Sequence, residues 1–253
     1  MDKHQFSKKP KKKKEKVENL YKILGTRSNI SQERIKEKYI EKVKEFPPET
    51  HPEEFQEIRK AYEILKDVKK RKQYDMMRKY GDKIEKAMED VERSMEIGDY
   101  GDAKKLLEYI VSLNPDNIAI KLKLAEVLLE LEEFKEFNLI IDEVLEMYDD
   151  EDKEYIIFIK FYMLNSKGYN DMALDSLEQG KKYLIKSEYH KLRIIALTDL
   201  GDFNQAWKEF KYAFPSTEDV DIDDLNILII WLNTAIELEK WGEISKIIQK
   251  NYG

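Results

Sequence analysis

The residue types that most often perform catalysis or bind metals are scarce in this chain. Its 253 residues include no cysteine and only three histidines, His4, His51 and His190, which lie far apart in sequence. Without cysteine there can be no disulfide, thiol nucleophile or cysteine-ligated metal. The sequence contains no phosphate loop, HExxH or nucleophile–base pair, and its 52 acidic residues make chance carboxylate pairs inevitable. We therefore expect no enzymatic activity, no metal site and no cofactor.

The elements that would position any functional side chain are expected to be helices. Charged residues make up 38% of the chain and apolar residues 42%, whereas it has only 9 glycines and 6 prolines. This composition favours an all-α protein, because a sandwich or barrel needs many more turn residues. Charged or polar residues interrupt every apolar stretch well before the ~18 residues that span a bilayer. The N-terminus also lacks an apolar signal segment, so we expect a soluble, cytoplasmic protein.

Charge divides the chain into three parts. Residues 1–16 carry eight lysines and two acids, a net +6, and residues 17–81 carry a net +4. Because the total is −7, residues 82–253 must carry −17. We expect a disordered tail over residues 1–16 and a domain boundary near residue 82. The tail could contact nucleic acid or an anionic membrane surface, although no aromatic residues are interleaved for base stacking.

Residues 17–81 have the pattern of a small helical bundle. Val17–Leu24 carries an apolar stripe at helical spacing, and Gly25 follows where a helix end favours a left-handed residue. Ser31 can cap a second helix that ends at Pro47-Pro48, and Pro52 can begin a third. A basic fourth helix is expected to end near Gly81.

This segment resembles a J domain, the helical module of DnaJ-type co-chaperones. The resemblance rests on ordered residues in the first, third and fourth predicted helices, namely Tyr21-x-x-Leu24-Gly25 and Phe55-x-x-Ile58-x-x-Ala61-Tyr62-x-x-Leu65-x-Asp67-x-x-x-Arg71-x-x-Tyr74-Asp75. It implies a J-like fold over about residues 17–81. It also implies a docking face for a DnaK-class chaperone on the second helix, at Arg34, Lys38, Lys42 and Lys44. These basic residues could equally belong to a solvated helix face of Glu–Lys pairs.

One motif departs from the family. J domains carry His-Pro-Asp after the second helix, and that tripeptide stimulates ATP hydrolysis by the chaperone. Pro47, Pro48 and Glu49 stand at this position, and proline has no ring nitrogen to replace the histidine. His51-Pro52-Glu53 resembles the tripeptide but lies four residues later. The J-like domain is therefore expected to lack ATPase-stimulating activity, with the alternative that His51 substitutes.

The acidic part of the chain repeats with a period near thirty-four. Gly98-Asp99-Tyr100-x-x-Ala103 and Gly201-Asp202-Phe203-x-x-Ala206 match across 103 residues, which leaves room for two more units between them. Weaker units surround Phe134, Tyr169 and Trp241. The pattern resembles the tetratricopeptide repeat (TPR). It implies four to five helical hairpins over residues 82–253, stacked as an α-solenoid, with alanines at the helix crossings.

The first helix of each such hairpin lines the concave face of the array. A strict spacing of thirty-four places a partner-binding groove at Leu122, Lys123, Ile156, Lys160, Met163, Lys191, Ile195 and Ile230. Apolar residues with a few lysines suit a peptide or helix of a protein partner. The alternative is that many of them simply pack between hairpins. The Lys and Asn set that grips a C-terminal carboxylate in some TPR proteins is missing.

Together these features predict a non-enzymatic, co-chaperone-like adaptor or scaffold. Its partners would be proteins, either a DnaK-class chaperone or a client. The alternatives are an active co-chaperone with a variant loop, and a nucleic-acid or membrane-surface binder that acts through residues 1–16. Self-association is a further possibility, because residues 1–81 carry +10 and residues 82–253 carry −17.

Overall fold

The computed structural model describes residues 18–213, 222–243 and 245, and all regular elements in these ranges are helices. The predicted tail, residues 1–16, lies outside them. The chain divides into two compact units, Met1–Glu89 and Asp90–Gly253. The all-α prediction is confirmed, and each unit is described by itself.

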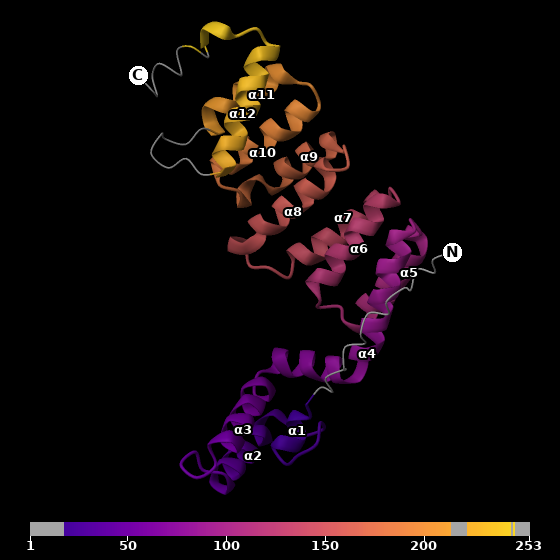
Figure 1. Cartoon of the computed structure of the whole chain (residues 1–253), viewed down its shortest axis with the longest axis vertical. Coiled ribbons are helices and arrows are strands. Elements are labelled where there is room, and N and C mark those ends of the chain that lie inside the picture. The colour runs from indigo at the N-terminus through magenta and orange to yellow at the C-terminus, as the bar shows by residue number, and fades with distance from the viewer. Residues whose placement is uncertain (1–17, 214–221, 244, 246–253) are drawn as a thin grey trace, which may run out of the picture. The chain divides into compact units, whose positions relative to one another are not determined.

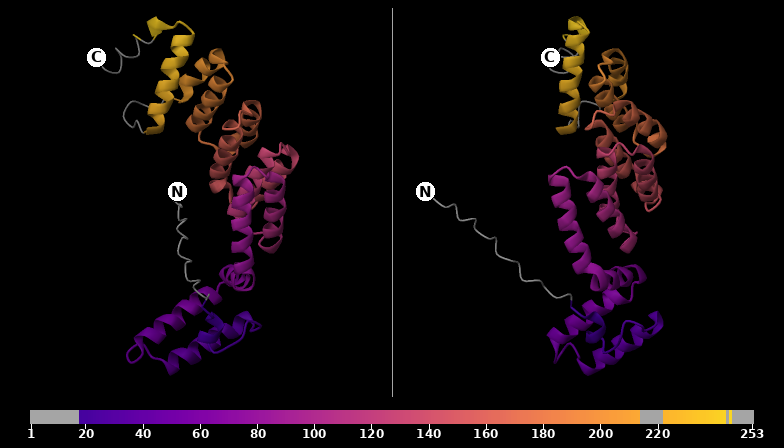
Figure 2. Two further views of the ribbon diagram at one scale, coloured as in Figure 1. Left: turned by 45° about the vertical axis from the view of Figure 1, so that its right-hand side comes forward. Right: turned by 90° about the vertical axis from the view of Figure 1, so that its right-hand side faces the viewer.

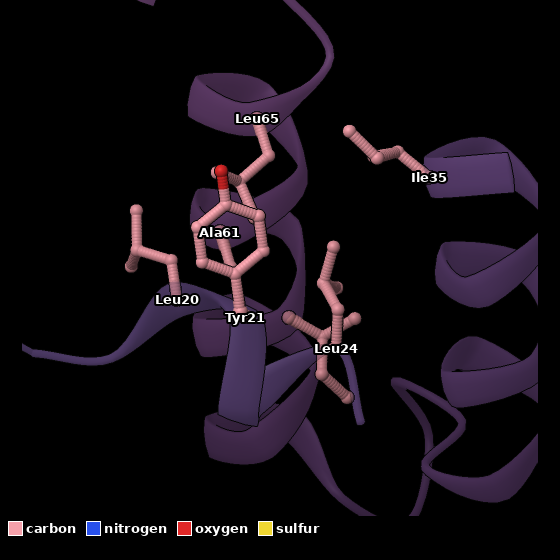
Figure 3. Packing of buried hydrophobic residues seen from close by; sticks show 7 residues of the cluster. Leu20, Tyr21, Leu24, Ile35, Ala61 and Leu65 are labelled. Atoms are coloured by element: carbon pink, nitrogen blue, oxygen red, sulfur yellow. The ribbon is translucent and has the colours of Figure 1, made fainter. Parts of the chain in front are cut away.

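The first unit is a helical bundle around one apolar core. It comprises α1 (Leu20–Ile23), α2 (Gln32–Glu45), α3 (Pro52–Leu65) and the beginning of α4 (Val68–Glu96), as Figure 1 shows. Figure 3 shows how side chains of α1, α2 and α3 converge. The fully or almost fully buried core residues are Leu20, Tyr21, Leu24, Ile35, Ile58, Ala61 and Leu65. These are the apolar positions that the helical spacing selected.

Two helices differ in length from the sequence prediction. The first helix begins at Leu20 because Asn19 caps it, accepting a hydrogen bond from the Lys22 amide at 3.3 Å. The fourth helix continues through Gly81 to Glu96. Glycine in a helix costs only about 1 kcal/mol relative to alanine, which a helix of 29 residues can absorb. The division between the units therefore falls inside α4, after the predicted position near residue 82.

Arg71 ties the loop between α1 and α2 to α4. Its Nε donates to Tyr21 Oη at 2.9 Å and its Nη1 to Gln32 Oε1 at 2.9 Å. Its Nη2 donates to the carbonyl oxygens of Ser28 and Ile30, at 3.1 and 2.7 Å. One side chain from α4 thus satisfies four acceptors on α1, α2 and the loop, which fixes the start of α2.

The second unit consists of antiparallel helical hairpins in chain order (Figures 1 and 2). The end of α4 pairs with the next helix, three complete hairpins follow, and α12 begins a further one. Two short 3₁₀ helices, η1 (Asp150–Asp152) and η2 (Lys181–Tyr183), lie in the connections. The helices are α5 (Tyr100–Leu113), α6 (Ile118–Glu130), α7 (Phe134–Leu145), α8 (Lys153–Asn165), α9 (Asn170–Gly180), α10 (Lys186–Asp199), α11 (Phe203–Ala213) and α12 (Ile222–Glu237).

A residue with positive φ marks the turn inside each hairpin. These residues are Gly98, Glu132, Gly168, Gly201 and Glu239, with φ between 54° and 80°. Their separations are 34, 36, 33 and 38 residues, so the repeat is present but its spacing varies. A left-handed residue is the usual way to end the first helix and begin the second. At positions 132 and 239 a glutamate adopts this conformation, which glycine would adopt without strain.

Alanines fill the helix crossings as predicted. Ala103, Ala125, Ala206 and Ala213 are completely buried. The ring of Phe134, just after one hairpin turn, meets the ring of Tyr169 of the next turn edge-on, with centroids 5.0 Å apart. Aromatic residues just after the turns of neighbouring hairpins therefore contact each other, which is how stacked repeats bury apolar surface that one hairpin cannot.

Candidate functional site

A groove of about 830 Å³ runs over the first helices of successive hairpins. Residues of four helices, α6, α8, α10 and α12, line it. They are Glu126, Leu129, Tyr155, Phe158, Ile159, Tyr162, Met163, Ser166, Lys167, Glu188, Lys191, Leu192, Ile195, Asn226 and Ile227. No second helix of a hairpin contributes to this lining, so the groove belongs to the face made by the first helices alone.

The groove wall formed by α8 is aromatic. Tyr155, Phe158 and Tyr162 lie three to four residues apart and therefore share one face of the helix. Tyr155 is 60% exposed and Tyr162 52% exposed, so large apolar surfaces remain accessible. Opposite them α10 contributes Leu192 and Ile195. Such a concave, mainly apolar surface with a few polar groups is typical of a site that accepts a peptide.

Charged residues of the groove are already paired with a neighbouring residue of opposite charge. Lys191 Nζ donates to Glu188 Oε1 at 2.8 Å within α10, and Lys123 Nζ donates to Glu126 Oε2 at 2.8 Å within α6. Lys167 donates to Glu130. With its lysines engaged by these carboxylates, the groove offers a peptide mainly apolar contacts rather than a clamp for a terminal carboxylate.

The structure brings together only some of the residues that the sequence placed in a groove. Met163, Lys191 and Ile195 line it. Leu122, Lys123 and Ile230 are half-buried and lie outside its lining. Ile156 and Lys160 are buried in the packing between helices, at 0% and 8% exposure.

The register of α8 accounts for this difference. The hairpin turns at Glu132 and Gly168 are 36 residues apart, two more than the spacing used for the prediction. A shift of two residues along a helix turns a side chain by about 200° around the helix axis. A position assigned to the groove therefore falls on the buried side. At the observed spacing the groove residue Glu126 corresponds to Tyr162, which also lines the groove, and not to the buried Lys160; Phe158 and Ile159 line it beside Tyr162. The position of Gly168-Tyr169 in the sequence was the signal that could have located them.

Lys160 occupies an unusual position for a lysine. It is almost completely buried on α8, and burial lowers the pKa of its ammonium group from the ordinary value, with Asp142 acting weakly in the opposite direction. Desolvation disfavours the charged form. The lysine therefore belongs to the interior of the array and does not present its ammonium group to the groove.

The loop after α2 contains the residues that stand where J domains have His-Pro-Asp. Pro47 is half-buried, whereas Pro48 and Glu49 are exposed. The His51 amide donates to the Pro47 carbonyl at 2.8 Å and forms the N-cap position of α3. The imidazole meets the Phe46 ring edge-on at 5.4 Å, and its Nδ1 lies 2.9 Å from Thr50 Oγ1. His51 thus packs against the end of α2.

The predicted chaperone-docking face lies on α2, where Arg34 is exposed and Lys38 and Lys42 are half-buried. These three each face an acid three residues later: Arg34–Glu37 at 3.7 Å, Lys38–Glu41 at 2.6 Å and Lys42–Glu45 at 2.6 Å. The bond from Lys38 lowers the pKa of the Glu41 carboxyl. Lys44 is exposed. The predicted basic residues lie along α2, and glutamates of the same helix partly offset their charge.

Within residues 18–213, 222–243 and 245, no group of three or more potential metal ligands is placed to hold an ion. In the same ranges no helix is long and apolar enough to cross a membrane.

Comparison with known proteins finds a known domain or repeat in part of each unit. Residues 19–75 match the DnaJ domain and residues 95–156 match the tetratricopeptide repeat. The first segment is similar to the Chaperone protein DnaJ of Thermotoga maritima, 46% identical over 70 residues (25% of this chain, 19% of the relative). It is also similar to that of Thermoplasma acidophilum, 42% identical over 66 residues (23% and 18%). The chain thus spans less than a fifth of these relatives. No solved structure matched.

Proposed function

We propose that this chain, with its DnaJ domain followed by tetratricopeptide repeats, is a non-enzymatic adaptor of the co-chaperone type. The repeat groove holds an apolar segment of a protein partner or client. The observation that carries this proposal is the continuous, aromatic and accessible lining contributed by first helices only. A cytoplasmic location fits such a role.

We further propose that the DnaJ domain of this chain does not stimulate a chaperone ATPase. Pro47 supplies no hydrogen-bonding ring where the family has histidine. Among the described residues, the histidine close to the loop is His51, which contacts Phe46 and Thr50. The exposed basic residues of α2 can still serve as a docking surface, so binding of a DnaK-class chaperone without activation is compatible with this domain.

Site-specific photocrosslinking tests the groove in the full chain. A benzoylphenylalanine introduced at Phe158, in the groove, should form a discrete adduct with a partner in cells of the source organism. The same amino acid at Leu139, which is 63% exposed on a second helix, serves as the matched control and should form none. Replacing both Tyr155 and Tyr162 by serine should remove the adduct. Equal adducts from both positions would contradict the proposal.

A further inference from the structure

A basic and aromatic patch lies at one edge of the otherwise acidic repeat unit, outside the groove lining. It comprises Lys182, Tyr183, Lys186, Lys211 and Tyr212, and we term it the edge patch. Its residues come from η2, the first turn of α10 and the last turn of α11. These segments adjoin because α10 and α11 form an antiparallel hairpin, so that the start of α10 lies beside the end of α11 (Figure 1).

Tyrosine rings hold the lysines of the edge patch in place. The Lys182 ammonium lies 4.5 Å from the centroid of the Tyr183 ring. The Lys211 and Lys186 ammonium groups lie 4.5 and 5.2 Å from the centroid of the Tyr212 ring. Cation–π contacts of this kind position an ammonium group without neutralising it.

The charge of the edge patch is only partly compensated in the part of the chain that the structure describes. Lys182, Lys186 and Lys211 are exposed. Lys182 lies near enough to Asp150 to help lower the pKa of that carboxyl, after the larger effect of Lys153, whereas Lys186 and Lys211 form no ion pair with a described carboxylate. Paired lysines border them, with Lys181 facing Glu178 at 3.9 Å and Lys153 facing Asp150 at 2.6 Å. Within residues 181–193 five Lys or Arg face a single Glu, whereas residues 82–253 carry a net charge of −17.

We propose that the edge patch binds an acidic peptide segment of a partner protein. Lys186 and Lys211 hold two exposed ammonium groups against one tyrosine ring, and with the nearby Lys182 they match a few neighbouring carboxylates of a peptide. A nucleic acid is a poorer match, because the patch tyrosines are already covered by cations and by the imidazole of His190, which stacks on Tyr212 at 4.7 Å. Beyond the patch an extended polyanion would also meet acids such as Asp150 and Glu151. This surface is independent of the groove.

Carbodiimide coupling in the full-length protein tests the proposal, since it joins carboxylates to lysines that they contact. The probe is an oligoglutamate peptide of about ten residues at physiological ionic strength, and the coupled lysines are mapped by mass spectrometry. Coupling should concentrate on Lys182, Lys186 and Lys211, above the exposed Lys105 and Lys135. The proposal would be overturned by uniform coupling over all exposed lysines, by coupling confined to residues 1–16, or by coupling only to the chain's own carboxylates.

Charge-matched variants provide a second readout. Lys186→Gln with Lys211→Gln should weaken peptide binding by about fivefold, whereas Lys105→Gln with Lys135→Gln should leave it unchanged. Equal losses in the two double variants would mean that only net charge matters and would overturn the proposal. Displacement of the peptide from the patch lysines by oligothymidylate at a lower concentration than by unlabelled oligoglutamate would assign the patch to nucleic acid instead.

Discussion

Replacing Arg71 by methionine should selectively destabilise the DnaJ domain. Methionine keeps most of the aliphatic stem but removes the four hydrogen bonds to Tyr21, Gln32 and the Ser28 and Ile30 carbonyls. The Tyr21 hydroxyl would keep its bond to Asp75 Oδ2 at 2.8 Å. The change therefore cuts the connection between α4 and the loop before α2 and leaves the apolar core intact.

The magnitude follows from the number and burial of the lost bonds. A hydrogen bond to a charged group contributes about 1.5–3 kcal/mol, but several bonds made by one side chain do not add. The exposed Ser28 carbonyl can regain water, whereas the partly buried Ile30 carbonyl and the groups around the buried Tyr21 regain less. We expect a loss of about 3 kcal/mol, a large fraction of the 5–15 kcal/mol that stabilises a typical domain.

The tryptophans allow the effect to be assigned to one unit. All three lie in the repeat unit, at positions 207, 231 and 241. In a urea titration of the full chain, the tryptophan fluorescence transition should stay in place. Far-UV circular dichroism and amide hydrogen exchange of residues 20–45 should report earlier unfolding of the DnaJ domain.

A neighbouring arginine provides the control. Arg78 also lies over the Tyr21 ring, at 5.2 Å, but it is exposed and its one hydrogen bond, to Asn19, is long at 3.4 Å. Arg78→Met should leave both transitions in place. If Arg71→Met lost no more stability than Arg78→Met, or if the two units shifted together, the assignment of Arg71 as the tie between α4 and the loop would be refuted.

Three further predictions concern the repeat unit. Glu132→Gly should raise the free energy of unfolding by about 1 kcal/mol, measured by urea titration, because glycine accepts a φ of 57° without strain. A loss would mean that the turn is not strained. Gly180→Ala should lower the melting temperature, because its Cβ would lie 2.7 Å from Ile157 Cδ1; Gly242→Ala, with open space around it, is the control. Lys160→Met should stabilise the protein by roughly 1 kcal/mol at pH 7. Because the folded-state pKa of Lys160 lies below its unfolded value, this gain should shrink as the pH rises toward 10.5, and a constant gain would contradict the assignment.

The sequence was most informative where one local signal determines one structural feature. Helical spacing selected the core positions Tyr21, Ile35 and Ala61, and Pro52 marked the start of α3. The Gly-Asp-aromatic signature located the turns after Gly98 and Gly201. The resemblance of residues 17–81 to a J domain also singled out Arg71, although nothing in the spacing indicated which groups Arg71 would bind.

Features that depend on register or on competing signals were harder to predict. Gly81 was expected to end a helix, but the residues around it favour helix formation and the helix continues to Glu96. On α8, two extra residues between turns rotated the groove face, so that Tyr155 and Phe158 were missed and Lys160 was misplaced. A single-residue property such as hydrophobicity cannot reveal this, because α8 is apolar on most of its faces.

The edge patch illustrates a third limit. Lys182 and Lys186 are close in sequence, but Lys211 and Tyr212 join them only through the pairing of α10 with α11. The net charge of −17 over residues 82–253 conceals this local basic surface. Knowledge of the hairpin contacts was needed to find it.

The central claim, an adaptor whose DnaJ domain lacks the trigger, is tested most directly by ATP turnover of the DnaK-class chaperone from the same organism. The wild-type chain should leave the steady-state rate unchanged. A Pro47→His, Glu49→Asp variant, which restores the family tripeptide in the loop after α2 and keeps the basic residues of α2 for docking, should stimulate it. Stimulation by the wild-type chain would contradict the account and make this protein a working co-chaperone with a variant loop.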